Sequence, residues 1–304
     1  MVEPVVAAIA VMGALGFIFG LGLSFASKAF HVDTDPRVDQ VRELLAGANC
    51  GACGLAGCDA FSEAVVAGSA AANGCTPGGT DVAEKIGEIM GSDVEVTEPQ
   101  IAVNRCRGAE SVCGLHCVYE GVECCSAAAL VGTGPKKCSY GCIALGDCVE
   151  ACKFDALTFG EGGIPHVITE NCVGCGACIK ACPKGLFELV PKNALVHVLC
   201  SSHDPGKVVG KLCKVGCIAC RICERACPVD AIHVVDELAV IDYEKCTECG
   251  ACAEKCPKKC IEDRRPADEI EASTKERAEK AAKEKAAKLA EVKKKMAEKK
   301  AAKD

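Results

Sequence analysis

The N-terminal part of the chain is an uninterrupted apolar run. From Pro4 to Ala26 no residue is charged, and at about 1.5 Å per residue this run is long enough to cross a hydrocarbon layer about 30 Å thick. A cleaved secretory signal is the alternative interpretation, but Met-Val-Glu-Pro precedes the run in place of a basic segment. The pattern therefore predicts an uncleaved transmembrane anchor over residues 1–28.

The charges around this run predict its orientation. Only Glu3 precedes it, whereas Lys28, Arg37 and Arg42 follow it. Basic residues that flank a membrane helix are retained on the cytoplasmic side. We therefore expect a single-pass protein of the cell membrane with its bulk on the cytoplasmic side.

Short segments of alternating apolar and polar residues recur in the second half of the chain. ALTF and PHVI flank GEGG, LFELV and ALVHVL flank PKN, and AIHVV and LAVIDY flank DE. Alternation on both sides of a turn is typical of β-hairpins. The pattern predicts three hairpins, at 156–168, 186–199 and 231–243.

The last segment, residues 264–304, is rich in Ala, Lys and Glu and has no aromatic residue. It carries fourteen basic and nine acidic side chains, so its net charge of +5 leaves −12 on the preceding 263 residues of a chain whose total is −7. Two interpretations stay open. The segment is either a solvated charged helix or tail, or an arm that docks on an acidic partner or an anionic membrane surface.

Cysteine changes the picture, because 28 of 304 residues are Cys and none is Trp. A content above 9% is typical of a scaffold held together by sulfur rather than by a large aromatic core. Disulfides need an oxidising compartment, and runs of C-x-x-C-x-x-C crowd the sulfurs too closely to pair with one another. Metal ligation is the better interpretation.

The cysteines form an internal repeat. Three copies of C-x₂-C-x₂-C-x₃-C-P begin at Cys172, Cys217 and Cys246, and a degenerate fourth copy covers 138–152, with Lys153 in place of the proline. This spacing is the bacterial ferredoxin signature, in which the fourth cysteine ligates the other cluster of a pair. Zinc ribbons also use paired C-x-x-C, but they do not account for three complete copies.

Four motifs pair into two tandem ferredoxin-like modules, predicted at 136–199 and 207–263. Exchange of the fourth cysteine within each pair predicts four sets of ligands. The sets are Cys138, Cys142, Cys148 and Cys182; Cys172, Cys175, Cys178 and Cys152; Cys217, Cys220, Cys223 and Cys256; and Cys246, Cys249, Cys252 and Cys227.

A fifth metal site is predicted in a small domain at 33–98. Cys50, Cys53, Cys58 and Cys75 follow the pattern C-x₂-C-x₄-C-x₁₆-C with no histidine nearby. Such a set favours iron–sulfur or zinc over catalysis, and the neighbouring motifs favour iron–sulfur.

A connecting region, 99–135, contains five further cysteines. Cys106, Cys113, Cys117 and Cys125 are the candidate ligands of a sixth cluster, and free thiols are the alternative. The sequence thus predicts five [4Fe–4S] clusters and leaves a sixth open. Cys200, Cys213 and Cys260 have no partner that spacing assigns.

Dinucleotide-binding and phosphate-binding motifs are absent from the sequence: there is no G-x-G-x-x-G and no Walker lysine loop. There is also no His/Glu zinc helix and no nucleophile elbow. We therefore predict no catalytic residue on this chain and no nucleic-acid partner.

The order of these segments carries a resemblance. An N-terminal anchor, C-x₂-C-x₄-C-x₁₆-C, GPKKCSYGCIALGDCVEACKFDAL and ferredoxin repeats together resemble the B subunit of the Rnf membrane complex over residues 1–260. The chain closely resembles the versions from anaerobes, in which a second ferredoxin doublet is present. The resemblance implies an ion-translocating ferredoxin:NAD⁺ oxidoreductase, coupled to Na⁺ or H⁺ transport, with this chain as the point of electron entry.

The same resemblance implies partners: reduced ferredoxin as donor, membrane subunits of the same complex, and a separate subunit with the flavin and NAD sites. It also implies that Cys50, Cys53, Cys58 and Cys75 bind the membrane-proximal cluster.

Together these patterns predict an α+β protein. It has a single N-terminal transmembrane helix, a small Fe–S domain, two tandem bacterial-type 2[4Fe–4S] ferredoxin-like modules and a charged C-terminal helix or tail. The predicted function is electron relay from ferredoxin to membrane partners and finally to NAD⁺. Two alternatives stay open: a polyferredoxin subunit of another membrane oxidoreductase, such as a hydrogenase-linked complex, and a structural zinc scaffold.

Overall fold

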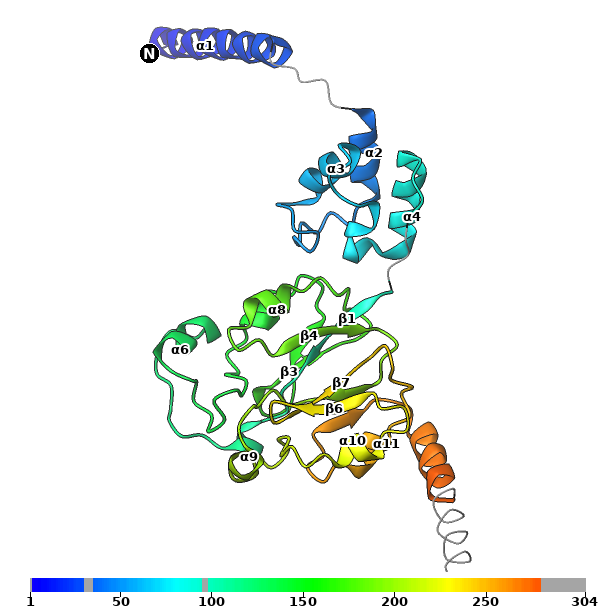
Figure 1. Ribbon diagram of the computed structural model, residues 1–304. Helices are drawn as coiled ribbons and strands as arrows, with labels where there is room; N and C mark the ends of the chain where they lie inside the picture. The colour runs from blue at the N-terminus through cyan, green and yellow to red at the C-terminus, as the bar shows by residue number, and fades with distance from the viewer. Residues whose placement is uncertain (1, 30–34, 95–97, 280–304) are drawn as a thin grey trace, which may run out of the picture.

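The computed structural model describes residues 2–29, 35–94 and 98–279. Along the chain, a long helix, a small helical domain and a region of short strands follow one another (Figure 1). Residues 30–34 after the predicted anchor, residues 95–97 of the predicted small domain and residues 280–304 of the predicted tail lie outside the described residues.

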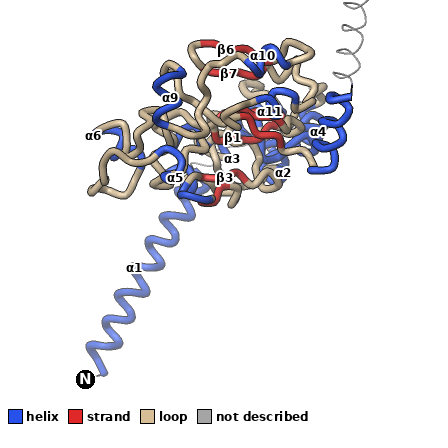
Figure 2. Tube along the Cα trace, turned by 90° about the horizontal axis from the view of Figure 1, so that it is seen from below, coloured by secondary structure: helices blue, strands red, loops and turns tan. Residues whose placement is uncertain are grey.

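The long helix is α1 (Val2–Ala29), and it covers the predicted anchor. Within the part of the chain that the structure describes, it is the one helix long and apolar enough to cross a membrane. Large side chains such as Phe17, Phe19 and Phe25 are exposed along it, and it extends away from the strands and loops (Figure 2). An exposed apolar helix of this length is suited to a lipid environment.

The small domain is built from three helices and two 3₁₀ turns around one apolar core. Val41, Phe61 and Ile86 are each at most 2% exposed in this core. Asp35 begins the first helix, where its carboxylate accepts a hydrogen bond from the Arg37 N–H. The elements are α2 (Pro36–Leu44), α3 (Cys58–Val66), η1 (Ala72–Gly74), η2 (Thr76–Gly78) and α4 (Gly79–Met90).

Among the described residues, four two-stranded antiparallel sheets follow the small domain. Two of them are hairpins between neighbouring strands, and two join strands that are far apart in the sequence. The pairs are β1 (Gln100–Asn104) with β4 (Phe187–Pro191), β2 (Leu157–Phe159) with β3 (Pro165–Val167), β5 (Val196–Val198) with β8 (Ile261–Asp263), and β6 (Ile232–Val235) with β7 (Leu238–Ile241).

Two of the three predicted hairpins are confirmed, those at 156–168 and 231–243. The predicted hairpin at 186–199 is wrong. Its two strands exist, but β4 pairs with β1 and β5 pairs with β8. Alternation of apolar residues identifies a strand and its buried face, whereas the partner strand is decided by packing over the whole domain.

The strand pairs divide the cysteine-rich region into two similar modules. Each has an outer sheet between its first and last strand and an inner hairpin. The first module therefore begins at β1, which pairs with β4, and the second begins at β5, which pairs with β8. We therefore propose module boundaries of 100–191 and 196–263, in place of 136–199 and 207–263. Between the first strand and the cysteine motif each module has an insertion, 105–140 and 199–215.

Short helices follow the cysteine motifs and fill the insertions. In each module the two helices behind the motifs pack against each other, α7 on α8 and α10 on α11. Those helices are α7 (Asp147–Glu150), α8 (Ala177–Ala181), α10 (Ile222–Ala226) and α11 (Ala251–Lys255); α5 (Glu110–Cys113), α6 (Cys125–Val131) and α9 (Gly206–Leu212) lie in the insertions, and the turn η3 (Glu161–Gly163) lies in the first hairpin.

Candidate iron–sulfur sites

The cysteine loops share one backbone conformation. In each complete motif the second and fourth residues after the first cysteine have a left-handed φ, between 52° and 71°. Residues turned in this way direct successive N–H groups towards one concave surface, which favours an anionic group. The residues are Gly174 and Gly176, Ala219 and Arg221, and Glu248 and Gly250.

The fourth, degenerate copy has the same backbone pattern at Ala144 and Gly146, with φ of 72° and 95°. These residues are the second and fourth after Cys142. The loop therefore begins structurally at Cys142 and not at Cys138.

The structure brings Cys256 next to the motif that begins at Cys217 and ends at Cys227, almost thirty residues earlier. Burial, together with the neighbouring thiols of Cys217, Cys220 and Cys256, raises the pKa of the Cys223 thiol to about 11. The fourth cysteine of one motif thus lies with the first three of the other. This is the arrangement that the predicted exchange of ligands requires.

The same exchange is visible in the first module. Burial raises the pKa of Cys175, and the nearby thiols of Cys50, Cys152 and Cys172 add to the rise. Cys152, Cys172, Cys175 and Cys178 also line one pocket. Four thiols around an apolar space suit a multi-atom cluster.

Backbone N–H groups point at the sulfurs of the fourth cysteines. In three motifs the N–H four residues further along donates to the cysteine Sγ, over 3.2–3.5 Å. Such bonds lower the electron density on a sulfur ligand and tune the potential of a bound cluster. The pairs are Ala156 to Cys152, Leu186 to Cys182 and Ala231 to Cys227.

A single metal ion needs its ligands to converge on one point. Within residues 2–29, 35–94 and 98–279, no three His, Cys, Asp or Glu side chains do so. The thiols lie instead around spaces such as the pocket of Cys152 and Cys178. The donor set is made of sulfur alone, which fits an iron–sulfur cluster.

The cysteines of the small domain also come together. Burial raises the pKa of Cys75, and the thiols of Cys58 and Cys50 raise it further. The Cys58 N–H donates to Asn49 Oδ1 over 2.8 Å, which fixes the start of α3. The site is therefore held between the first loop of the domain and α3.

Two lysines of the first module reach the cysteine loop of the small domain. Lys153 Nζ donates to the carbonyls of Asn49 at 3.1 Å and Ala48 at 3.4 Å, and Lys180 Nζ donates to the carbonyl of Gly51 at 3.4 Å. Lys153 occupies the position at which the complete motifs have proline. The departure from the motif thus provides a contact between two cluster-binding regions.

We expect Lys153→Met/Lys180→Met to loosen the small domain from the first module. These exposed contacts contribute on the order of 1 kcal/mol together, so limited proteolysis between the domain and β1 should become several-fold faster. Lys207→Met, which changes an exposed lysine in the other module, is the matched control. Equal cleavage rates for the double variant and the unmodified chain would contradict this role.

Lys136 is a buried cation without a counterion in the described structure. Its side chain is 4% exposed, and Nζ has no hydrogen-bond partner among the described residues. Its charge opposes the rise that burial causes in the pKa of Cys142. A buried charge is tolerated where an opposite charge faces it, and a bound anionic cluster next to Cys142 would supply that charge.

Lys136→Met should therefore lower the reduction potential of the cluster at Cys142, because the reduced state gains negative charge that the lysine stabilises. A loss of about 1.4 kcal/mol corresponds to about 59 mV for one electron. A potentiometric titration followed by EPR measures the shift. Lys137→Met, at the exposed neighbouring position, should leave the potential unchanged, and an equal potential in the Lys136 variant would exclude the effect.

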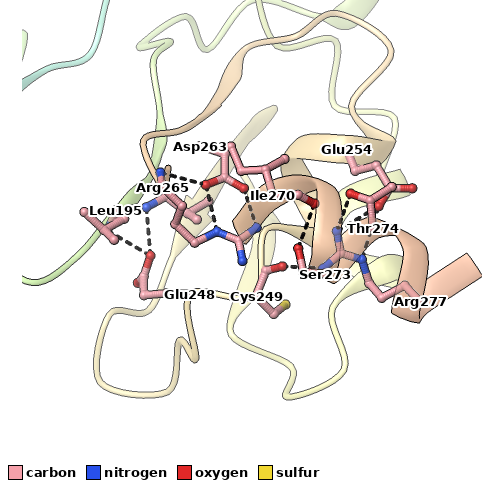
Figure 3. A network of polar contacts seen from close by, with 11 residues as sticks. Leu195, Glu248, Cys249, Glu254, Asp263, Arg265, Ile270, Ser273, Thr274 and Arg277 are labelled. Carbon is pink, nitrogen blue, oxygen red and sulfur yellow. Dashed lines mark hydrogen bonds and ion pairs between the residues drawn. The ribbon is translucent and has the colours of Figure 1, made fainter. Parts of the chain in front are cut away.

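The beginning of the predicted tail is attached to the second module. Residues 267–279 are helical, and Arg277 donates to the Cys249 carbonyl at 2.5 Å and to Glu254 at 2.9 Å (Figure 3). Arg265 pairs with Asp263 at 2.7 Å just before this helix. Arg277 thus fixes the loop that carries Cys249, a contact that the composition of the tail did not predict.

Comparison with known proteins agrees with this geometry. The family described as "Putative Fe-S cluster" matches residues 45–77. The family described as "4Fe-4S dicluster domain" matches residues 137–186 and 216–260. The matched segments fall within the small domain and within both cysteine-rich modules.

Whole proteins are also similar to this chain. The B subunit of the ion-translocating oxidoreductase complex of Methanosarcina acetivorans is 47% identical over 84% of this chain and 96% of its own length. The B subunit of the Na⁺-translocating ferredoxin:NAD⁺ oxidoreductase complex of Acetobacterium woodii is 43% identical over 86% and 78%. The proton-translocating counterpart of Clostridium ljungdahlii is 41% identical over 84% and 91%. The chain belongs to the family of Rnf-type B subunits of ion-translocating oxidoreductase complexes, as its cysteine pattern predicted.

Proposed function

We propose that this chain accepts electrons from reduced ferredoxin and relays them through its [4Fe–4S] clusters to membrane subunits, and finally to NAD⁺, with coupled Na⁺ or H⁺ translocation. The observation that carries the proposal is the succession of cysteine sites in the second module, the first module and the small domain. Each bound [4Fe–4S] cluster supplies a one-electron centre. We assign three kinds of partner: ferredoxin, the membrane subunits, and a protein of the same complex that binds flavin and NAD.

The sites within a module lie next to each other. Cys252 has Cys223 of the other set among the thiols that raise its pKa. Cys148 has both Cys182 and Cys178 among its neighbouring thiols. These contacts support electron transfer between the two clusters of a pair over a short distance.

The first module and the small domain are in contact at their sites. Cys50 is among the thiols around Cys175, and a cleft between the two regions is lined by Cys75, Cys172 and Cys175. This contact supports a route from the module towards the domain that follows the membrane helix α1. We propose that the cysteines of the small domain hold the membrane-proximal cluster.

The residues proposed as ligands are those of four predicted sets together with Cys142, Cys148 and Cys182 of the fifth, with the fourth cysteines exchanged within each module. The flanking apolar residues, such as Leu186 and Ile232 at 1% exposure, keep water from the sites. We further propose that the cell membrane anchors the chain through α1 with residues 35–304 on the cytoplasmic side, as the basic residues after the helix favour.

The charge of the tail supports a place for ferredoxin to dock. Residues 280–304 contain ten basic and four acidic side chains. Arg264, Arg265 and Arg277 are already paired with Glu262, Asp263 and Glu254. A deletion that starts at residue 280 therefore removes the net positive charge and keeps the contacts of the second module.

Stopped-flow mixing with reduced ferredoxin tests the proposal. We expect rapid reduction of the full chain, with a rate that falls as salt is added, because an acidic ferredoxin is attracted to the basic segment. Deletion of 280–304 should slow the reaction by about tenfold or more at low salt and flatten its salt dependence. If reduced ferredoxin fails to reduce the full chain within seconds, the proposed entry of electrons is excluded.

A further inference from the structure

Five cysteines line one pocket between the two modules. They come from both insertions, just as the thiols at the site of Cys152 and Cys178 come from two motifs. Val209 and Val215 contribute apolar surface. The five are Cys106, Cys113, Cys138, Cys200 and Cys213.

The two insertions contact each other directly at this pocket. Cys113 and Cys213 share a small buried core, against which Cys138 also packs. The Lys214 N–H donates to the Val112 carbonyl over 3.2 Å. The thiols of Cys113, Cys200 and Cys106 all add to the raised pKa of Cys213, so the sulfurs of both insertions are close together.

The fourth motif matches the second module without a gap when the chain is shifted by 75 residues. Cys142 then corresponds to Cys217, Cys148 to Cys223 and Cys152 to Cys227. The left-handed residues correspond as well, Ala144 to Ala219 and Gly146 to Arg221. In this register Cys138 corresponds to Cys213, which lies outside the ligand set of its own module.

Cys106 and Cys200 form a second corresponding pair. Each lies two residues after the first strand of its module. Cys106 Sγ accepts the Cys142 N–H at 3.4 Å, and Cys200 Sγ accepts the Cys217 N–H at 3.3 Å. The second module has the eight ligands of its two clusters without Cys200 and Cys213, so both of these thiols are spare.

The first module has Leu145 where the second has Cys220, so one ligand is missing from its loop. Cys125 packs in the same small core as Leu145, and its thiol is among those around Cys148. The Asp147 carboxylate accepts the N–H of Cys125 at 2.6 Å and fixes its position. Cys125 can thus complete the set of Cys142, Cys148 and Cys182, which releases Cys138 for the pocket.

We propose that the two insertions hold a sixth [4Fe–4S] cluster between the modules. Cys138 and Cys213 are ligands from either side, and two of Cys106, Cys113 and Cys200 complete the set. This inference rests on the proposed cluster-bearing function and adds to it the link between the modules. The ligand loops at Cys142 and Cys217 are hydrogen-bonded to the walls of this pocket, so the cluster would lie between the nearest sites of the two modules.

The test is the iron and sulfide content of the full chain, purified anaerobically in detergent. Six clusters require about 24 iron atoms per chain. Cys213→Ala should lose about four of them, Cys138→Ala about four, and the double variant again about four, because both residues belong to one cluster. Cys125→Ala/Cys138→Ala should lose about eight, because it disrupts two clusters.

Cys124→Ala is the matched control, because Cys124 does not line the pocket and belongs to none of the ligand sets. It should retain all the iron. EPR signals of the remaining clusters show that each variant is folded. If Cys213→Ala retains all the iron, the sixth site is excluded and the other five are unaffected. If the variant loses one zinc atom in place of iron and sulfide, the site is a zinc site and not a [4Fe–4S] cluster. A chain without iron would instead contradict the proposed function itself.

Discussion

Removal of iron from the purified chain should unfold both cysteine-rich modules. Six of the fourteen residues in the core of the second module are cysteines, and its strands are only three or four residues long. A two-stranded sheet is at best marginally stable alone. Metal binding therefore has to supply much of the folding free energy, which for a structural zinc site in a small peptide is about 10–16 kcal/mol.

Circular dichroism and limited proteolysis during anaerobic chelation measure this effect. We expect loss of β structure and rapid cleavage within 100–263, and recovery after iron and sulfide are added back. An iron-free chain that unfolds cooperatively at the same temperature as the loaded chain would contradict a role of the clusters in folding.

Cys227→Ala should remove the cluster of the other motif, that of Cys246, Cys249 and Cys252, and should spare the cluster of Cys217. The structure supports this exchange because Cys256 lies with Cys217, Cys220 and Cys223, and because α10 and α11 pack together. The single variant should lose about four iron atoms per chain.

Double variants separate the exchanged arrangement from the direct one. Cys227→Ala/Cys246→Ala should also lose about four iron atoms, whereas Cys227→Ala/Cys217→Ala should lose about eight. If Cys227→Ala/Cys246→Ala lost about eight iron atoms and Cys227→Ala/Cys217→Ala lost about four, each motif would hold its own cluster. Cys260→Ala is the control, because its buried sulfur lies 3.6 Å from Cys256 Sγ but is outside the proposed sets.

The sequence was sufficient to predict the complete motifs, because four sulfurs at fixed spacing allow few arrangements in space. It was insufficient for the register of the degenerate copy. Counting cysteines placed Cys138 first in the motif, whereas the left-handed residues place Cys142 there and put Leu145 at the position of Cys220. The backbone at Ala144 and Gly146 reveals the register, and a gapless alignment of 137–157 with 212–232 would have found it.

Strand pairing shows a second limit of the sequence. The segment 194–199 has the alternation of a strand, but Val196 and His197 are completely buried, so both faces of β5 are covered. A strand buried on both faces gives no information about which strand lies beside it. Its partner β8 follows more than sixty residues later.

Side-chain contacts between distant segments could not be predicted from the sequence either, because they depend on how the chain folds. Lys153 reaches carbonyl groups more than 100 residues earlier in the chain, and Arg277 reaches back to Cys249. A lysine in place of the motif proline was the one signal of the first contact. The charge of the tail gave no indication that Arg277 is fixed while other basic residues follow it.

The content of iron, acid-labile sulfide and zinc in the anaerobically purified full chain tests the central claim most directly. The proposed electron relay predicts about 20 iron atoms from the five sets of ligands, or about 24 with the site between the modules, and an equal amount of sulfide. Substantial zinc with little sulfide would contradict it and leave a structural scaffold.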